Sequence, residues 1–208
     1  MRPDDKTRLI DLYEGRWKVH GPGVKTLGWT GPEDQHLRFD VLATIGDLRG
    51  KKICDVGCGF GDLLPFLENR FTRIEYTGID LVASLVEEAR RRHAGKRFLC
   101  LDILEDPFDE RFDYFLLSGA LSFRITDNMA HTQAMMRRMF DLCDEGVGVN
   151  FLSSYVNFER EHNYHHRPEE LFSFSKTLTN WVSLRHDYPL WEFTIFLYKR
   201  PQKPISLV

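Results

Sequence analysis

Between residues 51 and 152, short apolar runs alternate with longer segments in which apolar residues recur at helical spacing. Apolar runs of this kind are typical of strands in a sheet that is covered on both faces. Their alternation with helices predicts an α/β fold with a parallel sheet. The expected strands are 52–56, 73–79, 97–101, 112–118 and 148–152, and the expected helices between them are 62–71, 81–93 and 127–143.

The alternation stops after residue 155. Residues 168–178 predict a helix, and residues 182–186 and 191–198 predict two strands joined by a turn that contains Pro189. A closing antiparallel hairpin on the parallel sheet is the simplest interpretation.

The first 50 residues differ from the rest of the chain. They predict two helices, 4–17 and 32–48, separated by a loop rich in Gly and Pro. We therefore expect two parts: a helical arm of residues 1–49 and an α/β domain of residues 50–208.

The charge balance bears on the partner. The 208 residues include 28 Lys and Arg against 31 Asp and Glu, a formal net charge of −3. A protein that binds nucleic acid through its phosphates normally carries a basic excess. The one dense basic stretch, residues 90–97, falls at an expected helix end, where cations are favoured. We therefore expect no nucleic-acid partner.

The four cysteines, Cys54, Cys58, Cys100 and Cys143, match no zinc-ligand spacing. We interpret them as reduced packing residues and expect no metal site. Charged residues interrupt the N-terminus, so it predicts no secretory signal. No apolar run is long enough to span a bilayer. The expectation is a cytoplasmic protein with no membrane partner.

A glycine loop carries the main chemical signal. Asp55-Val56-Gly57-Cys58-Gly59-Phe60-Gly61 follows the first expected strand and opens a helix. Such glycines let a ligand approach the backbone, and amides at a helix N-terminus face it. Dinucleotide sites share this loop, but residues 62–64 lack the further glycine of their motif. The Asp55 carboxylate would repel a pyrophosphate, whereas it can pair with an ammonium group.

Two further carboxylates follow strands. Asp80 ends the second expected strand about 20 residues after the loop, where a carboxylate can accept both hydroxyls of a ribose. The alternative is an N-cap of the next helix. Asp102 follows the third expected strand and could accept a hydrogen bond from an adenine amino group, with Ile103 against the ring. The alternative is a carboxylate that only stabilises a turn.

This order of motifs, with Ser118-Gly119 after the fourth expected strand, resembles the class I S-adenosylmethionine-dependent methyltransferases over roughly residues 50–200. The resemblance implies a small single-domain member with a Rossmann-like three-layer sandwich. Its seven-stranded sheet would be mostly parallel, with a C-terminal antiparallel hairpin. The implied cofactor is S-adenosylmethionine, and the product is S-adenosylhomocysteine.

The resemblance also implies roles for particular residues. Asp55 and the glycine loop would hold the methionine moiety, Asp80 the ribose and Asp102 the adenine. Ser118 and Gly119 would line the floor beneath the methyl donor. The residues expected to bind the cofactor are Asp55, Gly57, Cys58, Gly59, Gly61, Asp80, Leu81, Asp102, Ile103, Ser118 and Gly119.

The acceptor is harder to predict, because methyl transfer from a sulfonium depends mainly on alignment and leaves little residue signature. The Asn/Asp-Pro-Pro-aromatic motif of DNA amino-methyltransferases is absent after the fourth expected strand. Neither the fourth nor the fifth expected strand ends in the cysteine that cytosine-carbon methyltransferases need. We expect a small-molecule acceptor. A protein or RNA methyltransferase and a non-catalytic S-adenosylmethionine sensor remain alternatives, and no oligomeric state is predicted.

Two segments could form the acceptor pocket. One is the N-terminal arm, expected either to cover the cofactor as a lid or to pack as an ordinary helix on the sheet. Its candidate residues are Tyr13, Arg16, Trp17, His20, Trp29, Gln35, His36, Arg38 and Phe39.

The other segment is residues 153–167, after the fifth expected strand. It offers Tyr155, His162, His165 and His166 as candidates for a catalytic role. A metal held by His162 with one of the other histidines is disfavoured, because the segment has few apolar positions and reads as a loop. Arg124 either binds an acidic acceptor or forms a surface salt bridge.

Overall fold

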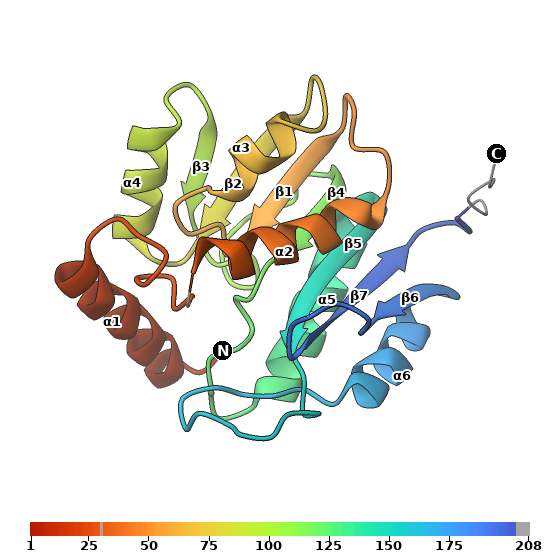
Figure 1. The fold of residues 1–208 in the computed structure, drawn as a ribbon. Coiled ribbons are helices and arrows are strands. Elements are labelled where there is room, and N and C mark those ends of the chain that lie inside the picture. Colours follow the sequence, from red (N-terminus) through yellow and green to blue (C-terminus); the bar gives the residue numbers. More distant parts are fainter. Residues whose placement is uncertain (30, 203–208) are drawn as a thin grey trace.

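The computed structural model describes residues 1–29 and 31–202 and contains one seven-stranded sheet between layers of helices (Figure 1). The strand order is β3-β2-β1-β4-β5-β7-β6. The first five strands pair in parallel, and β7 runs antiparallel to both of its neighbours. This confirms the expected mostly parallel sheet with a C-terminal antiparallel hairpin. The strands are β1 (Lys52–Val56), β2 (Glu75–Asp80), β3 (Arg97–Cys100), β4 (Phe112–Leu117), β5 (Cys143–Leu152), β6 (Trp181–Arg185) and β7 (Glu192–Tyr198).

Helices cover both faces of the sheet. Adjacent residues of a strand point to opposite faces, so each face presents apolar side chains to a helical layer. Ile53 belongs to the apolar cluster formed with one helical layer, whereas Cys54 belongs to the cluster formed with the other. The first layer contains α2 (Pro32–Leu42), α3 (Leu63–Glu68) and α4 (Ala83–Arg92), and the second contains α5 (Asn128–Leu142) and α6 (Pro168–Leu178). The three-layer sandwich is confirmed.

Helix α1 (Pro3–His20) lies apart from these layers, at the end of the sheet where β1 and β2 finish (Figure 1). Its Leu9 packs in a small apolar cluster with Phe60 and Val82. Its Asp5 is buried and accepts a hydrogen bond from the Thr126 amide at 3.0 Å, which lowers the pKa of that carboxyl. Helix α1 is thereby fixed at both the glycine loop and the segment after β4.

Two boundaries differ from the sequence-based prediction. Strand β5 begins at Cys143 rather than at residue 148, because the two carboxylates near its start have partners. Asp144 pairs with Arg111, and Glu145 pairs with Lys51 and Tyr114. The second expected helix ends at Leu42 and continues as a 3-10 turn, Ala43–Ile45. All other expected helices and strands are present, with ends shifted by a few residues.

The interpretation of the cysteines was wrong for one of the four. Cys54, Cys58 and Cys143 are free and buried, whereas Cys100 is free and exposed. Cys100 lies on β3, and β3 is an edge strand of the sheet, so the helices cover it incompletely. Across the residues that the structure describes, no helix has both the length and the apolar character needed to cross a membrane.

Candidate active site

A cavity of about 360 Å³ lies at the carboxyl ends of the parallel strands, beneath α1 and the loop that follows it. Ligands of open α/β sheets bind at this edge, and the volume is within the usual range for small-molecule sites. Every residue expected to bind the cofactor lines this cavity except Gly61. At Gly61, an added Cβ would meet the Phe98 ring at 2.7 Å, so this glycine serves close packing.

The glycine loop is held tightly against β2. Gly57 has φ of 72°, and a Cβ there would lie 2.4 Å from the Cβ of Ala120. The amides of Gly57 and Cys58 both donate to the carbonyl of Ile79, at 2.8 and 3.1 Å. The backbone is therefore fixed close to the cavity with no side chain at Gly57 to occupy it.

Asp55 is a buried carboxyl that lines the cavity. The Tyr76 hydroxyl donates to Asp55 Oδ2 at 2.6 Å. Burial raises the pKa of Asp55, the Tyr76 hydrogen bond opposes the rise, and the negative charges of Asp80 and Asp62 add to it, so that the pKa is about 7. A cationic ligand group beside Asp55 would stabilise its charged form.

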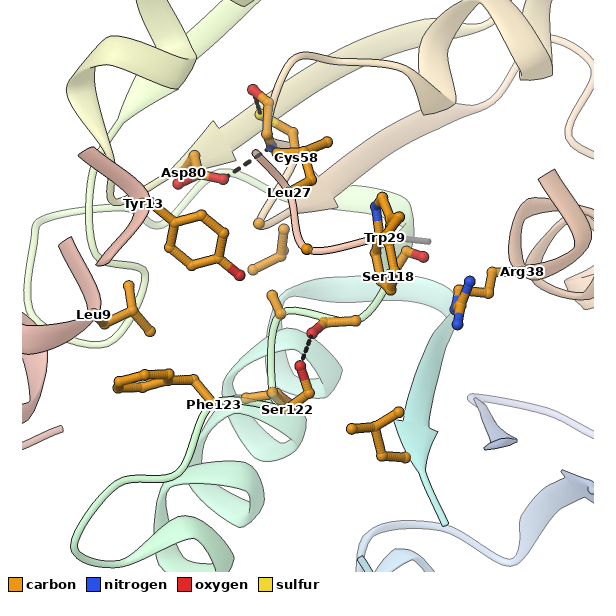
Figure 2. Close-up of a pocket in the computed structure, with 18 of the residues that line it drawn as sticks. Leu9, Tyr13, Leu27, Trp29, Arg38, Cys58, Asp80, Ser118, Ser122 and Phe123 are labelled. Atoms are coloured by element: carbon orange, nitrogen blue, oxygen red, sulfur yellow. Dashed lines mark hydrogen bonds between the residues drawn. The ribbon is translucent and has the colours of Figure 1, made fainter. Parts of the chain in front are cut away.

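Asp80 links β2 to the glycine loop. Its Oδ2 accepts from the Gly59 amide at 2.9 Å (Figure 2). Its Oδ1 accepts from the Val82 amide at 3.0 Å. Burial raises the pKa of Asp80, and these backbone hydrogen bonds oppose it. The N-cap position of α4 is Val82, so Asp80 does not itself cap that helix. Each carboxylate oxygen retains a lone pair that can accept from a ligand.

Asp102 is already paired with α1. Its Oδ2 accepts from Lys6 Nζ at 2.8 Å, and its Oδ1 accepts from the Leu104 amide at 3.0 Å. Lys6 also reaches Glu105 at 2.8 Å. These contacts outweigh burial and lower the pKa of Asp102, so the carboxylate is charged. The sequence analysis missed Lys6, because no local pattern indicates a partner for it.

The residues that line the cavity include one with an unsatisfied polar group. Ser118 Oγ is buried and has no hydrogen-bond partner within the described part of the chain. Buried hydroxyls are normally paired, so this one is available to a ligand. Beside it, Gly119 has φ of 75°, and a Cβ there would lie 2.2 Å from the Trp29 ring. Figure 2 shows Trp29, Ser118 and Arg38 in the same part of the cavity view.

Arg38 forms a buried pair with Glu192 of β7. Arg38 Nε donates to Glu192 Oε2 at 2.8 Å, and Nη2 donates to Oε1. The guanidinium carbon also lies 4.3 Å from the centre of a Trp29 ring. Burial raises the pKa of Glu192, and Arg38 opposes that rise. Glu192 was also missed by the sequence analysis, since a carboxylate at a strand end has no distinctive pattern.

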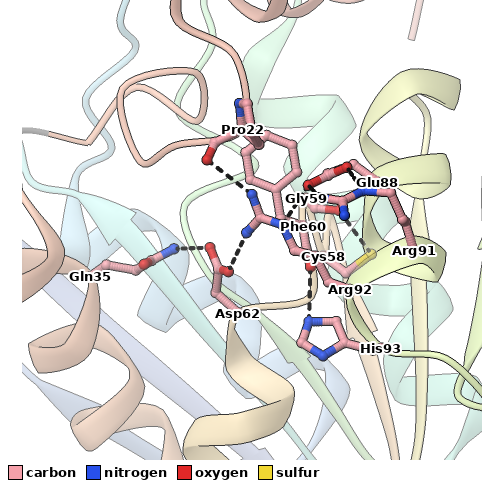
Figure 3. A network of polar contacts seen from close by, with 10 residues as sticks. All are labelled: Pro22, Gln35, Cys58, Gly59, Phe60, Asp62, Glu88, Arg91, Arg92 and His93. Carbon is pink, nitrogen blue, oxygen red and sulfur yellow. Dashed lines mark hydrogen bonds and ion pairs between the residues drawn. The ribbon is translucent and has the colours of Figure 1, made fainter.

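A polar network joins the covering segments to the glycine loop (Figure 3). Asp62 accepts from Arg92 Nη1 and from Gln35 Nε2, both at 3.2 Å. Arg92 Nη2 donates to the carbonyl of Pro22 at 3.0 Å. Arg92, at the basic end of α4, is therefore linked through Asp62 to Gln35 of α2 and directly to the loop after α1.

The arm residues separate into two groups. Trp17 packs against Phe60 with ring centres 5.5 Å apart, outside the cavity, and neither His20 nor His36 lines it. The candidate arm residues that do line the cavity are Tyr13, Arg16, Trp29, Gln35, Arg38 and Phe39.

Of the four catalytic candidates after β5, two line the cavity and two do not. His162 and His165 line the cavity, whereas Tyr155 and His166 do not. Tyr155 is exposed and its hydroxyl lies 3.3 Å from Glu169. His166 is buried, and burial lowers its pKa to about 4, so it is neutral at pH 7.

Two further sequence-based alternatives bear on binding. Arg124 does not line the cavity; its side chain donates to the carbonyl of Glu161 at 2.9 Å and lies 3.6 Å from Glu159, in agreement with the surface salt-bridge alternative. Among the residues that the structure describes, no cluster of three or more His, Cys, Asp or Glu side chains is placed to hold a metal.

Comparisons with known proteins agree with this geometry. A methyltransferase-domain family model matches residues 53–146. A Mycobacterium tuberculosis protein named as a methyltransferase is 34% identical over 71% of this chain and 92% of its own length. The fatty-acid O-methyltransferase of Mycolicibacterium smegmatis is 39% identical over 38% of the chain, which spans only 30% of that relative.

A solved structure has a similar fold. The magnesium protoporphyrin IX methyltransferase of Synechocystis PCC 6803, crystallised with bound S-adenosylmethionine, superposes with a TM-score of 0.68. The match covers 96% of this chain and 99% of that chain at 19% identity.

Proposed function

The chain belongs to the class I S-adenosylmethionine-dependent methyltransferases, and we propose that it methylates a small-molecule acceptor held in the same cavity as the cofactor. The observation that carries this proposal is the extent of the cavity. Besides the residues expected to bind the cofactor, its lining includes Arg38, His165 and Glu192. Trp29 and the loop after β5 also line the cavity, whose volume of about 360 Å³ is within the range of small-molecule sites. The names of several relatives, which act on fatty acids and trans-aconitate, support the same acceptor class.

The lining residues fit the cofactor. We propose that Asp55 pairs with its ammonium group, that Asp80 accepts the ribose hydroxyls, and that Ile103 packs against the adenine. The unpaired Ser118 hydroxyl is available to the part of the cofactor near the methyl group. When bound, S-adenosylmethionine supplies an electrophilic methyl group on a sulfonium whose sulfur departs as a neutral thioether. The chain therefore needs no acid, and its work is to align the acceptor and to exclude water.

Water exclusion falls to the N-terminal arm. We propose that residues 1–49 form a lid over the cofactor domain of residues 50–208. Within this lid, Phe39 and Leu42 of α2 are buried against the sheet, so the opening motion belongs to residues before α2. Tyr13 and Leu27 lie above the cavity (Figure 2).

The buried, unpaired Cys54 and Cys143 are consistent with a proposed cytoplasmic location.

A labelling experiment tests the acceptor class. The protein is incubated with methyl-labelled S-adenosylmethionine and a cell extract that has been separated by size. We expect label in the small-molecule fraction, and less label with the Asp80→Ala variant when S-adenosylmethionine is below saturation. Label confined to macromolecules would contradict the acceptor class and support a protein or RNA methyltransferase. Tight cofactor binding with no label in any fraction would support the non-catalytic sensor.

A further inference from the structure

The imidazole of His165 is held in one tautomer. Its Nδ1 lies 2.8 Å from the carbonyl oxygen of Ser153. A carbonyl oxygen only accepts, so Nδ1 carries the proton, and Nε2 of the neutral ring is an unprotonated acceptor. Within the described residues, no hydrogen-bond partner occupies Nε2, and the residue lines the cavity. This is the arrangement of a general base that is ready to take a proton.

The backbone around His165 is fixed at both ends. The Ser154 amide donates to the carbonyl of His166 at 2.8 Å, and the His166 amide donates to the carbonyl of Leu152 at the same distance. The His166 ring lies in the core, 5.0 Å from Phe151, with its Nε2 3.3 Å from the carbonyl of Leu121. His166 thus anchors the segment, and His165 is presented to the cavity in a defined orientation.

Charged groups surround His165 from two other elements. Glu192 of β7 is near enough for the positive charge of His165 to lower the pKa of that carboxyl. Arg38 of α2 pairs with the same carboxylate, and the charge of Asp34 also acts on it. Neighbouring His166 stays neutral at pH 7. A proton taken by His165 would therefore be placed beside a carboxylate that is already part of a buried pair.

The other candidates lack one of these features. His162 lines the cavity, but its ring is exposed and has no partner among the described residues to fix a tautomer. His166 uses Nε2 for the Leu121 carbonyl and lies outside the cavity. Tyr155 also lies outside it.

We propose that His165 Nε2 is the general base of the reaction and that the acceptor atom carries a dissociable proton, as a hydroxyl, a phenol or an amine does. This rests on the proposed methyl transfer. The acceptor lone pair forms the new bond to the methyl carbon as the carbon–sulfur pair leaves with sulfur. The O–H or N–H pair stays on the acceptor atom, and its proton passes to Nε2. The imidazolium then returns the proton to water.

The first test needs no acceptor. Nitrogen NMR of histidine-labelled protein reports which ring nitrogen carries the proton, and His165→Asn assigns the signal. We expect the neutral His165 ring to be protonated at Nδ1, the minor tautomer of free histidine. Protonation at Nε2 would overturn the proposal. The result does not depend on whether any acceptor has been found.

The second test measures transfer of label to the extract fraction that accepts it. His165→Asn retains a donor for the Ser153 carbonyl but lacks Nε2. His186→Asn is the matched control, because His186 is an exposed histidine that does not line the cavity. We expect His165→Asn to lower the rate at pH 7 by about 100-fold or more with unchanged cofactor affinity, since general bases contribute on the order of 10²–10⁴-fold. The rate should recover at high pH, where the acceptor ionises unaided. The control should stay within about threefold of wild type.

Three outcomes decide the proposal. A His165→Asn rate within about threefold of wild type would overturn it, and so would a loss that is uniform with pH. If wild type transfers no label at all, the proposed function fails separately, and the tautomer measurement alone decides the role of His165.

Discussion

At the scale of single residues, two carboxyls that line one cavity have pKa values shifted in opposite directions. Asp55 is buried with only a hydroxyl as its hydrogen-bond donor, and its pKa is raised to about 7. Asp102 is paired with Lys6, and its pKa is lowered. Asp55 therefore changes charge near neutral pH, whereas Asp102 does not. The difference follows from whether a cation lies beside the carboxylate.

The raised pKa of Asp55 makes a prediction about stability. The unfolded carboxyl ionises near 3.8 and the folded one near 7, so folding stability falls as pH rises from about 3.8 to about 7 and is then constant. The full cost is about 4 kcal/mol. We expect Asp55→Asn to remove it, since the amide oxygen can still accept from Tyr76. Urea denaturation at pH 4 and pH 8 checks this: the variant should gain stability over wild type at pH 8 only. An equal difference at both pH values would contradict the assignment.

His166 should change folding stability with pH in the opposite direction to Asp55. Its pKa is lowered by burial from 6.5 to about 4. The unfolded state binds a proton first, so stability is present above pH 6.5 and is lost as pH falls toward 4, by up to about 3 kcal/mol. His166→Gln can still donate to Leu121 and does not titrate. Thermal unfolding of the variant should show less acid sensitivity than wild type between pH 7 and pH 4. Parallel curves would show that His166 does not titrate in this way.

At the scale of elements, α1 depends on a few polar contacts with the cavity edge. Lys6 bridges Asp102 and Glu105, and Asp5 accepts from Thr126. Helix α1 has few buried residues, Asp5 and Leu9. A helix held by so few buried groups opens at lower cost than the core. This fits a covering element that must admit ligands.

Lys6→Met tests the contact between α1 and Asp102. Removing the cation leaves Asp102 and Glu105 unpaired, and we expect amide hydrogen exchange in α1 to become about tenfold faster, equivalent to about 1.4 kcal/mol. Lys18→Met is the matched control, because Lys18 lies in the last turn of the same helix and forms no ion pair within the described residues. Equal exchange in both variants would show that the Lys6 contacts do not hold α1.

At the scale of the whole molecule, the sheet and the gathering of the expected cofactor residues around one cavity were largely predictable from the sequence. Strands and helices show local periodicity, and the glycine loop, Asp80 and Asp102 follow strand ends at characteristic intervals. The pairs that shape the cavity were not predictable. Lys6 and Asp102 are 96 residues apart, and Arg38 and Glu192 are 154 apart. Partner choice over such separations follows from tertiary packing and leaves no local pattern.

Tertiary packing also explains the other points at which the structure departs from the sequence-based predictions. The early start of β5 depends on cations from other elements that pair with Asp144 and Glu145. The exposure of Cys100 depends on β3 lying at the sheet edge. The choice of His165 among three histidines required the position of the Ser153 carbonyl.

Binding of S-adenosylmethionine by the carboxylates at the strand ends is tested most directly by calorimetric titration. We expect wild type to bind with a dissociation constant in the micromolar range, about −8 kcal/mol. Asp80→Ala should weaken binding by roughly 1.5–3 kcal/mol, the range for hydrogen bonds to a charged group. Asp144→Ala, at a surface pair with Arg111, is the control and should bind as wild type does. No measurable binding by wild type, or equal affinity for the folded Asp80→Ala variant, would contradict the account.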